Sequence, residues 1–131
     1  MSELVGVIQR LEHAIGSPAR DPGWQPGMAR ALGLLRSAFA DHVAVTEGPA
    51  GLYADVVEHS PRLARGVSDL LWEHRVVWSA LDALEGALCD SDAEPDIQRH
   101  AARLLRGLWR HRQRGADLLY EAYTCDIGGE T

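Results

Sequence analysis

The sequence predicts an all-α protein, arranged as an up-down-up-down antiparallel four-helix bundle. Apolar residues recur three and four positions apart over long stretches, which is the period of an amphipathic helix. No stretch alternates apolar and polar residues for long enough to indicate a strand. Short Gly/Pro-rich connections between the stretches favour antiparallel neighbours. With 131 residues, 46% of them hydrophobic, the chain suits a single domain over residues 1–131.

Breaks in the apolar pattern set the expected ends of the helices. Gly48-Pro49 stops the second helix, and Ser60-Pro61 starts the third with a capping residue followed by a proline. The segment 17–26, with three prolines, is expected to be a loop, and 50–60 a short helical turn or an irregular cap. The four helices are predicted at about 3–15, 27–47, 60–88 and 95–123.

Three of the six histidines fall on inward faces of these helices. At 100° per residue, His42, His74 and His111 lie on the apolar stripes of the second, third and fourth helices. His13 lies opposite the stripe of the first helix and should be solvated. The rise of about 1.5 Å per residue puts His74 and His111 at nearly the same level of an antiparallel bundle. Three imidazoles are therefore expected to converge inside one end of the bundle.

Converging buried imidazoles have two interpretations. A neutral imidazole needs a partner for each ring nitrogen, and one shared metal ion would satisfy three rings at once. Alternatively, each ring is an ordinary core histidine that bonds to a main-chain carbonyl or to water. The sequence leaves both interpretations open.

Three stretches of the sequence resemble the hemerythrin-like, HHE cation-binding family: HVAVTEGPAGLY (42–53), PRLARGVSDLLWEHRVVWSALDAL (61–84) and LLRGLWRHRQRGADLLYEAY (104–123). The resemblance implies a four-helix bundle that holds non-haem iron. It places His42, His74 and His111 at the histidine positions of the second, third and fourth helices. Glu47 is the only candidate for the carboxylate that the family has one turn after the first of these, because Thr46 stands at that place.

Other positions depart from the family pattern. The first-helix candidate, His13, points outward. Trp78 replaces the second histidine of the third helix, and Gly115 and Ala116 stand where the fourth-helix carboxylate should be. Because an iron pair needs bridging carboxylates, this set suits one Fe²⁺ or Zn²⁺ ion with an open position, or no ion, better than a di-iron site. By resemblance, the role would be binding or sensing of oxygen, nitric oxide or iron.

Several classes of function are disfavoured. A net charge of −6 disfavours binding to nucleic acid or to anionic membranes, so the arginines along the fourth helix are expected to form a solvated face. The N-terminal stretch does not resemble a signal peptide and no apolar run could span a bilayer, so a cytoplasmic protein is expected. Two cysteines make neither a disulfide framework nor a zinc ribbon. No nucleophile–base pair or phosphate-binding loop is present, so catalytic turnover is not indicated.

Two tryptophans suggest a contact surface. Trp72 and Trp109 fall outside the apolar stripes and are expected to be exposed on a monomer, as at a homodimer interface. They also support the second hypothesis, a metal-free helical bundle that acts as an interaction or structural module.

Overall fold

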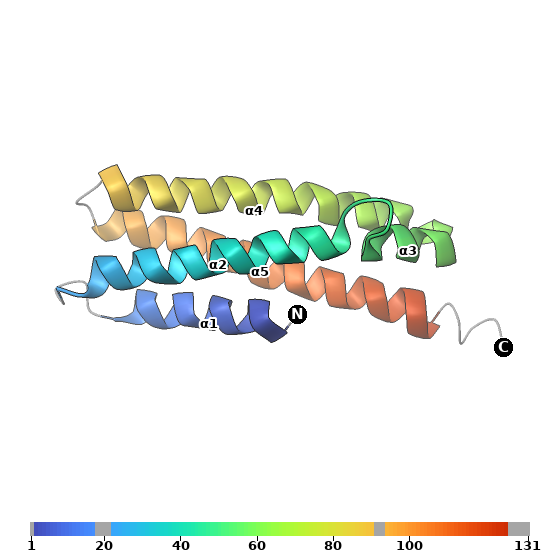
Figure 1. The fold of residues 1–131 in the computed structure, drawn as a ribbon, viewed down its shortest axis with the longest axis horizontal. Helices are drawn as coiled ribbons and strands as arrows, with labels where there is room; N and C mark the ends of the chain where they lie inside the picture. Colours follow the sequence, from blue (N-terminus) through green and yellow to red (C-terminus); the bar gives the residue numbers. More distant parts are fainter. Residues whose placement is uncertain (1, 18–21, 91–93, 126–131) are drawn as a thin grey trace.

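The computed structural model describes residues 2–17, 22–90 and 94–125, and every element within these ranges is helical. Successive long helices run in opposite directions along the long axis, as in an up-down helical bundle (Figure 1). Three shorter elements complete the described chain: α3 (Leu52–His59), the 3-10 turn Pro61–Leu63, and the π-helical turn Glu121–Cys125. The long helices are α1 (Ser2–Gly16), α2 (Trp24–Thr46), α4 (Ala64–Asp90) and α5 (Glu94–Tyr120).

Helix α2 begins three residues earlier than the sequence predicted. Its cap is Gly23, and Pro26 lies in its first turn. A proline is tolerated there because the backbone N–H that it lacks would have no partner within the helix. The assignment of residues 24–26 to a loop was therefore wrong, while residues 18–21 of the predicted loop lie outside the described residues.

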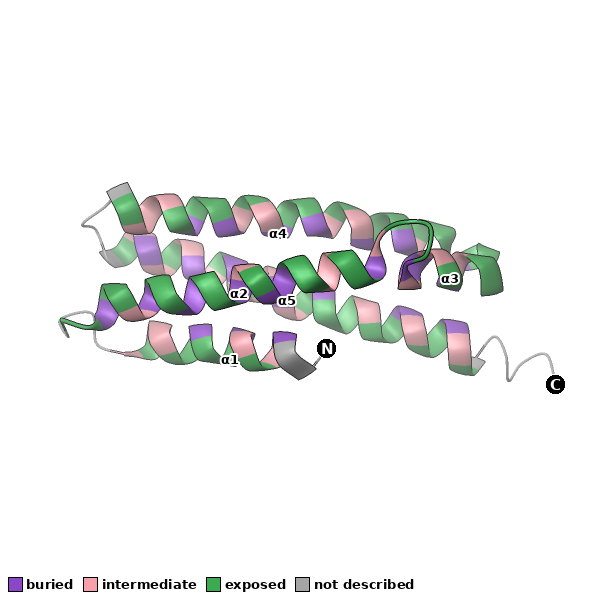
Figure 2. Cartoon of the chain, in the orientation of Figure 1, coloured by how far each residue is buried: buried purple, intermediate pink, exposed green. Residues whose placement is uncertain are grey.

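The core consists of two apolar clusters. Buried positions recur along the helices over the length of the bundle (Figure 2). The large cluster draws on α1, α2, α4 and α5 and includes Phe39, Val77 and Leu108. The small cluster joins α3 to α4 and α5 and includes Tyr53, Val56, Leu63, Val67, Leu70, Leu118 and Ala122. Along α4 and α5, His74 and His111 stand where one cluster gives way to the other. A layer of buried polar groups thus separates the two clusters.

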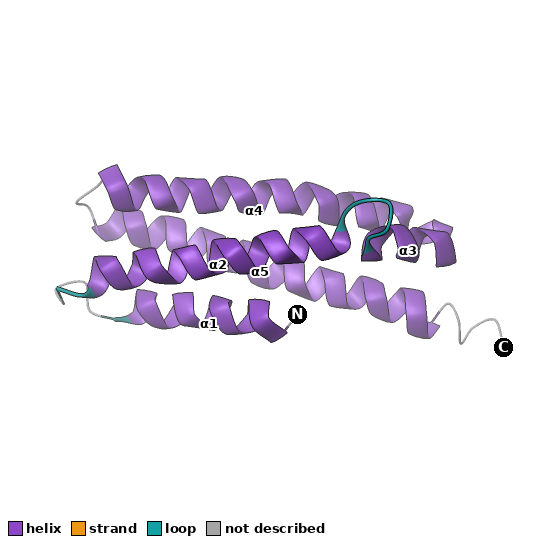
Figure 3. Ribbon diagram, in the orientation of Figure 1, coloured by secondary structure: helices purple, strands orange, loops and turns teal. Residues whose placement is uncertain are grey.

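The connection from α2 to α4 consists of a short loop, helix α3 and a 3-10 turn (Figure 3). Gly48 has φ +90°, a conformation that side chains disfavour, and a Cβ on Gly51 would collide with the carbonyl oxygen of Glu47. Both glycines are therefore required by the tight path of the chain. Beyond them, residues expected to form a short helical turn or an irregular cap make the eight-residue helix α3, which packs Tyr53 and Val56 into the small cluster.

The surface only partly matches its prediction. Trp72 is exposed, with 63% of its surface accessible, as expected. Trp109 was predicted to be exposed, but it is partly buried against the large cluster and its indole N–H donates to Glu12 at 3.1 Å. The partner, Glu12, lies on α1, and the sequence analysis did not predict a contact between Trp109 and that helix. None of the described helices combines the length and the apolar character that a membrane crossing requires.

Candidate metal centre

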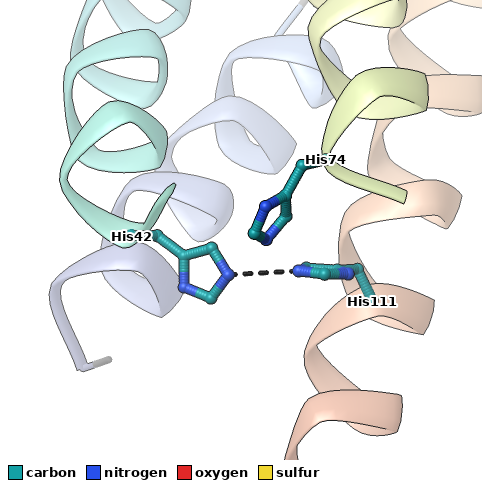
Figure 4. Close-up of side chains that lie close together, drawn as sticks. All are labelled: His42, His74 and His111. Carbon is teal, nitrogen blue, oxygen red and sulfur yellow. Dashed lines mark hydrogen bonds between the residues drawn. The ribbon is translucent and has the colours of Figure 1, made fainter. Parts of the chain in front are cut away.

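Three helices bring their histidines together in the polar layer. His42 projects from α2, His74 from α4 and His111 from α5, and the three rings face one another (Figure 4). The ring centroids are 4.8 to 5.2 Å apart. One nitrogen from each ring can be chosen so that all three atoms lie within 4.8 Å of one another. The structure therefore unites the histidines that the helical period placed on inward faces, and His13 is exposed as predicted.

Two of the rings are held by carboxylates at their Nδ1 atoms. His74 Nδ1 lies 2.5 Å from Glu47 Oε2, and His111 Nδ1 lies 2.7 Å from Glu73 Oε1. A carboxylate only accepts hydrogen bonds, so each of these nitrogens must carry the proton and donate it. In the neutral ring, the proton on Nδ1 leaves a free lone pair on Nε2. The carboxylates thus fix a tautomer in which both Nε2 atoms are acceptors.

The Nε2 lone pairs of His74 and His111 have too few hydrogen-bond donors around them among the described residues. His42 Nε2 lies 3.1 Å from His111 Nε2, so it can donate to that one atom if it carries the proton. His74 Nε2 is completely buried and has no hydrogen-bond partner among the described residues. Leaving a buried acceptor unpaired costs about 1–3 kcal/mol. The site therefore presents an electron-rich nitrogen that the surrounding protein does not satisfy.

The spacing of the nitrogens suits a transition-metal ion. Two imidazole nitrogens, each about 2.0–2.1 Å from a tetrahedral ion, lie about 3.3 Å apart. The separation of 3.1 Å between the Nε2 atoms of His42 and His111 is close to this value. A metal-bound histidine commonly donates its other ring N–H to a carboxylate, which is the arrangement at His74 and His111. One pair of the three nitrogens thus has the spacing of tetrahedral ligands, and the third ring, His74, has a nitrogen within 4.8 Å of both.

Burial keeps the rings of His42 and His111 in the form that binds metal. Desolvation, with the nearby rings of His111 and His74, lowers the pKa of His42 from 6.5 to about 4. Desolvation also lowers the pKa of His111, although its hydrogen bond to Glu73 acts in the opposite direction. Near neutral pH both imidazoles are uncharged, and only unprotonated nitrogens can coordinate a cation.

Glu47 contacts one of the three histidines but does not belong to the group of converging nitrogens. It was predicted as a fourth ligand, and its oxygen instead contacts His74 Nδ1, on the far side of that ring from Nε2. Glu47 follows the last residue of α2, where the backbone turns to an extended conformation. Its neighbour Thr46 donates its hydroxyl to the carbonyl of His42 at 2.8 Å and so ties the end of the helix to the site. This position fits a residue that orients His74.

Glu73 was not identified from the sequence. It adjoins His74 on α4, its side chain is 17% exposed, and it forms an ion pair with Arg114 behind His111. Arg114 had been assigned to a solvated arginine face, but it reaches across from α5 to α4. A glutamate beside an inward histidine is a weak signal in sequence, because its partner on another helix depends on how the two helices are rotated.

Aromatic side chains enclose the imidazoles. Phe39 lies against all three rings, and Tyr53 stacks on His74 with centroids 5.7 Å apart. Trp78, one turn after His74, contacts Phe39 edge to face. Trp78, which stands where the resemblance expects a second histidine, thus takes part in the apolar wall. Burial raises the pKa of Tyr53 to about 12, so its hydroxyl stays protonated.

A cavity of about 230 Å³ opens beside the site. His42 and Tyr53 line it, together with Gly115 of α5. Gly115 stands where the resemblance expects a carboxylate, and a Cβ added there would meet no atom within 4 Å. Asp117, two residues further on, is exposed and accepts a hydrogen bond from Gln113. The α5 side of the site thus offers space in place of a further ligand.

Comparison of the chain with protein-family models, with curated proteins and with solved structures finds no match in any of the three. The function must therefore be inferred from the geometry of the site.

Proposed function

We propose that this protein is a hemerythrin-like antiparallel four-helix bundle that binds a single non-haem metal ion. His42, His74 and His111 are the ligands, through Nε2, and at least one coordination position stays open. Glu47 and Glu73 orient two of the rings and raise their basicity. Iron is the ion that the resemblance indicates, and zinc suits three imidazoles equally well. The role is reversible binding or sensing of a small ligand such as oxygen or nitric oxide, or of iron itself, in the cytoplasm.

The unpaired Nε2 atom of His74 carries the proposal. Among the described residues this buried atom has no partner, while a carboxylate on the opposite nitrogen directs its lone pair towards two other imidazoles. A core histidine normally has both nitrogens satisfied. A cation at the centre of the three rings removes the cost of the unpaired lone pair.

A single ion fits this set better than a pair. No carboxylate belongs to the group of converging ligand atoms in the described part of the chain, and bridging carboxylates are what hold two cations close together. Trp78 packs on Phe39 at the place where a second histidine would stand. The alternative is a metal-free interaction module. In that case the exposed Trp72 would provide a contact for a partner or for a second copy of the chain.

Metal analysis of protein purified without an affinity tag distinguishes these functions. We expect about one equivalent of iron or zinc per chain, and a loss of most of it in His74→Ala and His111→Ala. His13→Ala is the matched control, because His13 is exposed on α1, and it should retain the metal. Metal-free wild-type protein that takes up neither Fe²⁺ nor Zn²⁺ under reducing conditions would leave the interaction module as the function.

A further inference from the structure

The cavity beside His42 is partly open to solvent and is lined mainly by apolar side chains from four helices. Leu4 of α1, Ala38 and Val45 of α2, Leu52 of α3 and Leu119 of α5 contribute to its wall. Helix α1 runs along only one half of the bundle and α3 covers the other end, so the wall includes residues near the start of each (Figure 1). The cavity borders the three-histidine site at His42 and extends away from it, because His74 and His111 do not line it.

A glycine keeps this space open. Gly115 lies inside α5, five residues before its last residue, where a glycine costs about 0.5–1 kcal/mol relative to alanine. No close packing requires it, since a Cβ would meet nothing within 4 Å, and no positive φ requires it either. The absence of a side chain contributes to the volume of the cavity at the expense of helix stability.

The polar groups of the wall restrict what can enter. Thr46 already donates to the carbonyl of His42, and Tyr53 forms a side-chain hydrogen bond with Thr46. Asp41 is the one charged residue in the described lining, and it disfavours an anion. His42 is the remaining polar group, and it belongs to the three-histidine site. A ligand would therefore be apolar along most of its surface and polar only at the end near His42.

We propose that this cavity binds a neutral, mostly apolar small molecule of about six to nine non-hydrogen atoms. An apolar cavity of roughly 150 Å³ accepts benzene, and this one is larger, at about 230 Å³. The ligand carries a neutral nitrogen or oxygen donor at the end that faces His42, where it reaches the open position of the metal. This last contact depends on the proposed function, whereas occupation of the cavity does not.

Two probes of nearly equal size separate the two parts of the proposal. Indole has no free nitrogen lone pair, and benzimidazole has one. In metal-free protein, both should bind saturably and shift the amide resonances of Leu52, Tyr53 and Leu119. Gly115→Leu fills the space and should weaken both affinities at least about tenfold, while Gly115→Ala should weaken them less.

Gly107→Leu is the matched control. Gly107 lies two turns earlier on α5, is also half-buried with no atom within 4 Å of an added Cβ, and lines a different cavity. It should leave both affinities within about twofold. Thermal unfolding confirms that each variant is folded. Failure of both probes to bind, or binding that Gly115→Leu leaves unchanged in a folded protein, would overturn the assignment of the cavity.

The contact with the metal is tested in Co²⁺-loaded protein. Benzimidazole should change the visible absorption of the cobalt ion, and indole should not. Equal behaviour of the two probes would overturn the donor contact while leaving the cavity assignment intact. A protein that binds indole but takes up no Co²⁺ contradicts the proposed metal function instead, so the two failures are distinguishable.

Discussion

The histidines on α4 and α5 are supported differently from the histidine on α2. His74 and His111 are 1% and 2% exposed, and each donates its Nδ1 proton to a carboxylate. His42 is only half-buried, lines the cavity, and has no described side chain bonded to its Nδ1. The α4–α5 side of the site is thus fixed in tautomer and orientation, and the α2 side is free to adjust. Such a division suits a centre that holds an ion firmly while a ligand enters from one direction.

The largest effect should be the pH dependence of the free energy of unfolding, and it should arise from His42 on the α2 side of the site. In metal-free protein the pKa of His42 is about 4, against 6.5 when unfolded. Between these pH values the unfolded chain binds the extra proton, so the free energy of unfolding falls as pH falls through this window. Because His42 is only half-buried and solvent screens part of this shift, the loss attributable to it from pH 7 to pH 4 is about 2 kcal/mol. Urea unfolding of chelator-treated wild type and of His42→Gln across this range measures it.

The comparison between the two proteins isolates His42 from carboxylates that titrate in the same range. We expect a clearly flatter profile in His42→Gln, and a wild-type profile in His13→Gln, whose histidine is exposed. Identical pH profiles for wild type and His42→Gln would mean that the folded protein protonates His42 as easily as the unfolded chain does. The contrast between the two sides would then not exist.

The helical period was sufficient to predict the all-helical class and the inward placement of the three histidines, because both depend on local geometry. Placing His42, His74 and His111 required only 100° per residue and the level of each along its helix. The prediction was accurate where a long apolar stripe defined a face, as at Leu104 and Leu108 of α5, both of which are buried.

The supporting residues could not be predicted in this way. Glu73 and Arg114 border the apolar stripes, and they meet only because of how α4 and α5 are rotated against each other. Tyr53 reaches His74 because Gly48 and Gly51 reverse the chain after α2. Partners across helices depend on packing angles and on the path of a connection, and neither is encoded in a local period.

The two carboxylates provide the next test of the contrast. Glu73→Gln and Glu47→Gln each replace a charged acceptor by a neutral one of the same shape, so the Nδ1 bond weakens and the imidazole becomes less basic. Each should lower the affinity for Zn²⁺ or Fe²⁺ by about 10- to 100-fold. Asp41→Asn, on an exposed carboxylate next to His42, should change it by no more than about twofold. Competition with a chromophoric chelator measures all three affinities.

A structural role for the carboxylates would give a different pattern. Their loss would then lower the stability of the metal-free protein and leave the affinity of the folded fraction unchanged. We expect the reverse for Glu47, whose side chain is 39% exposed and can be hydrated when the bond weakens. Equal affinities of Glu47→Gln and Asp41→Asn would show that the fixed and adjustable sides do not differ in their support of the ion.

The smallest predicted effect is on the stability of the metal-free protein when His74 is replaced. In metal-free protein, His74→Leu removes the buried Nε2 atom that lacks a partner and replaces it with an apolar group. It also removes the bond to Glu47, whose carboxylate can turn to water because it is partly exposed. An unpaired buried acceptor costs about 1–3 kcal/mol and a charge-assisted hydrogen bond contributes about 1.5–3 kcal/mol, so the two contributions roughly cancel and the variant should be about as stable as wild type. His111→Leu should instead destabilise the protein, because Glu73 is more buried and would lose its ring partner. Chemical denaturation with chelator present compares the two, and a large loss of stability in His74→Leu would show that His74 serves the core and not an ion.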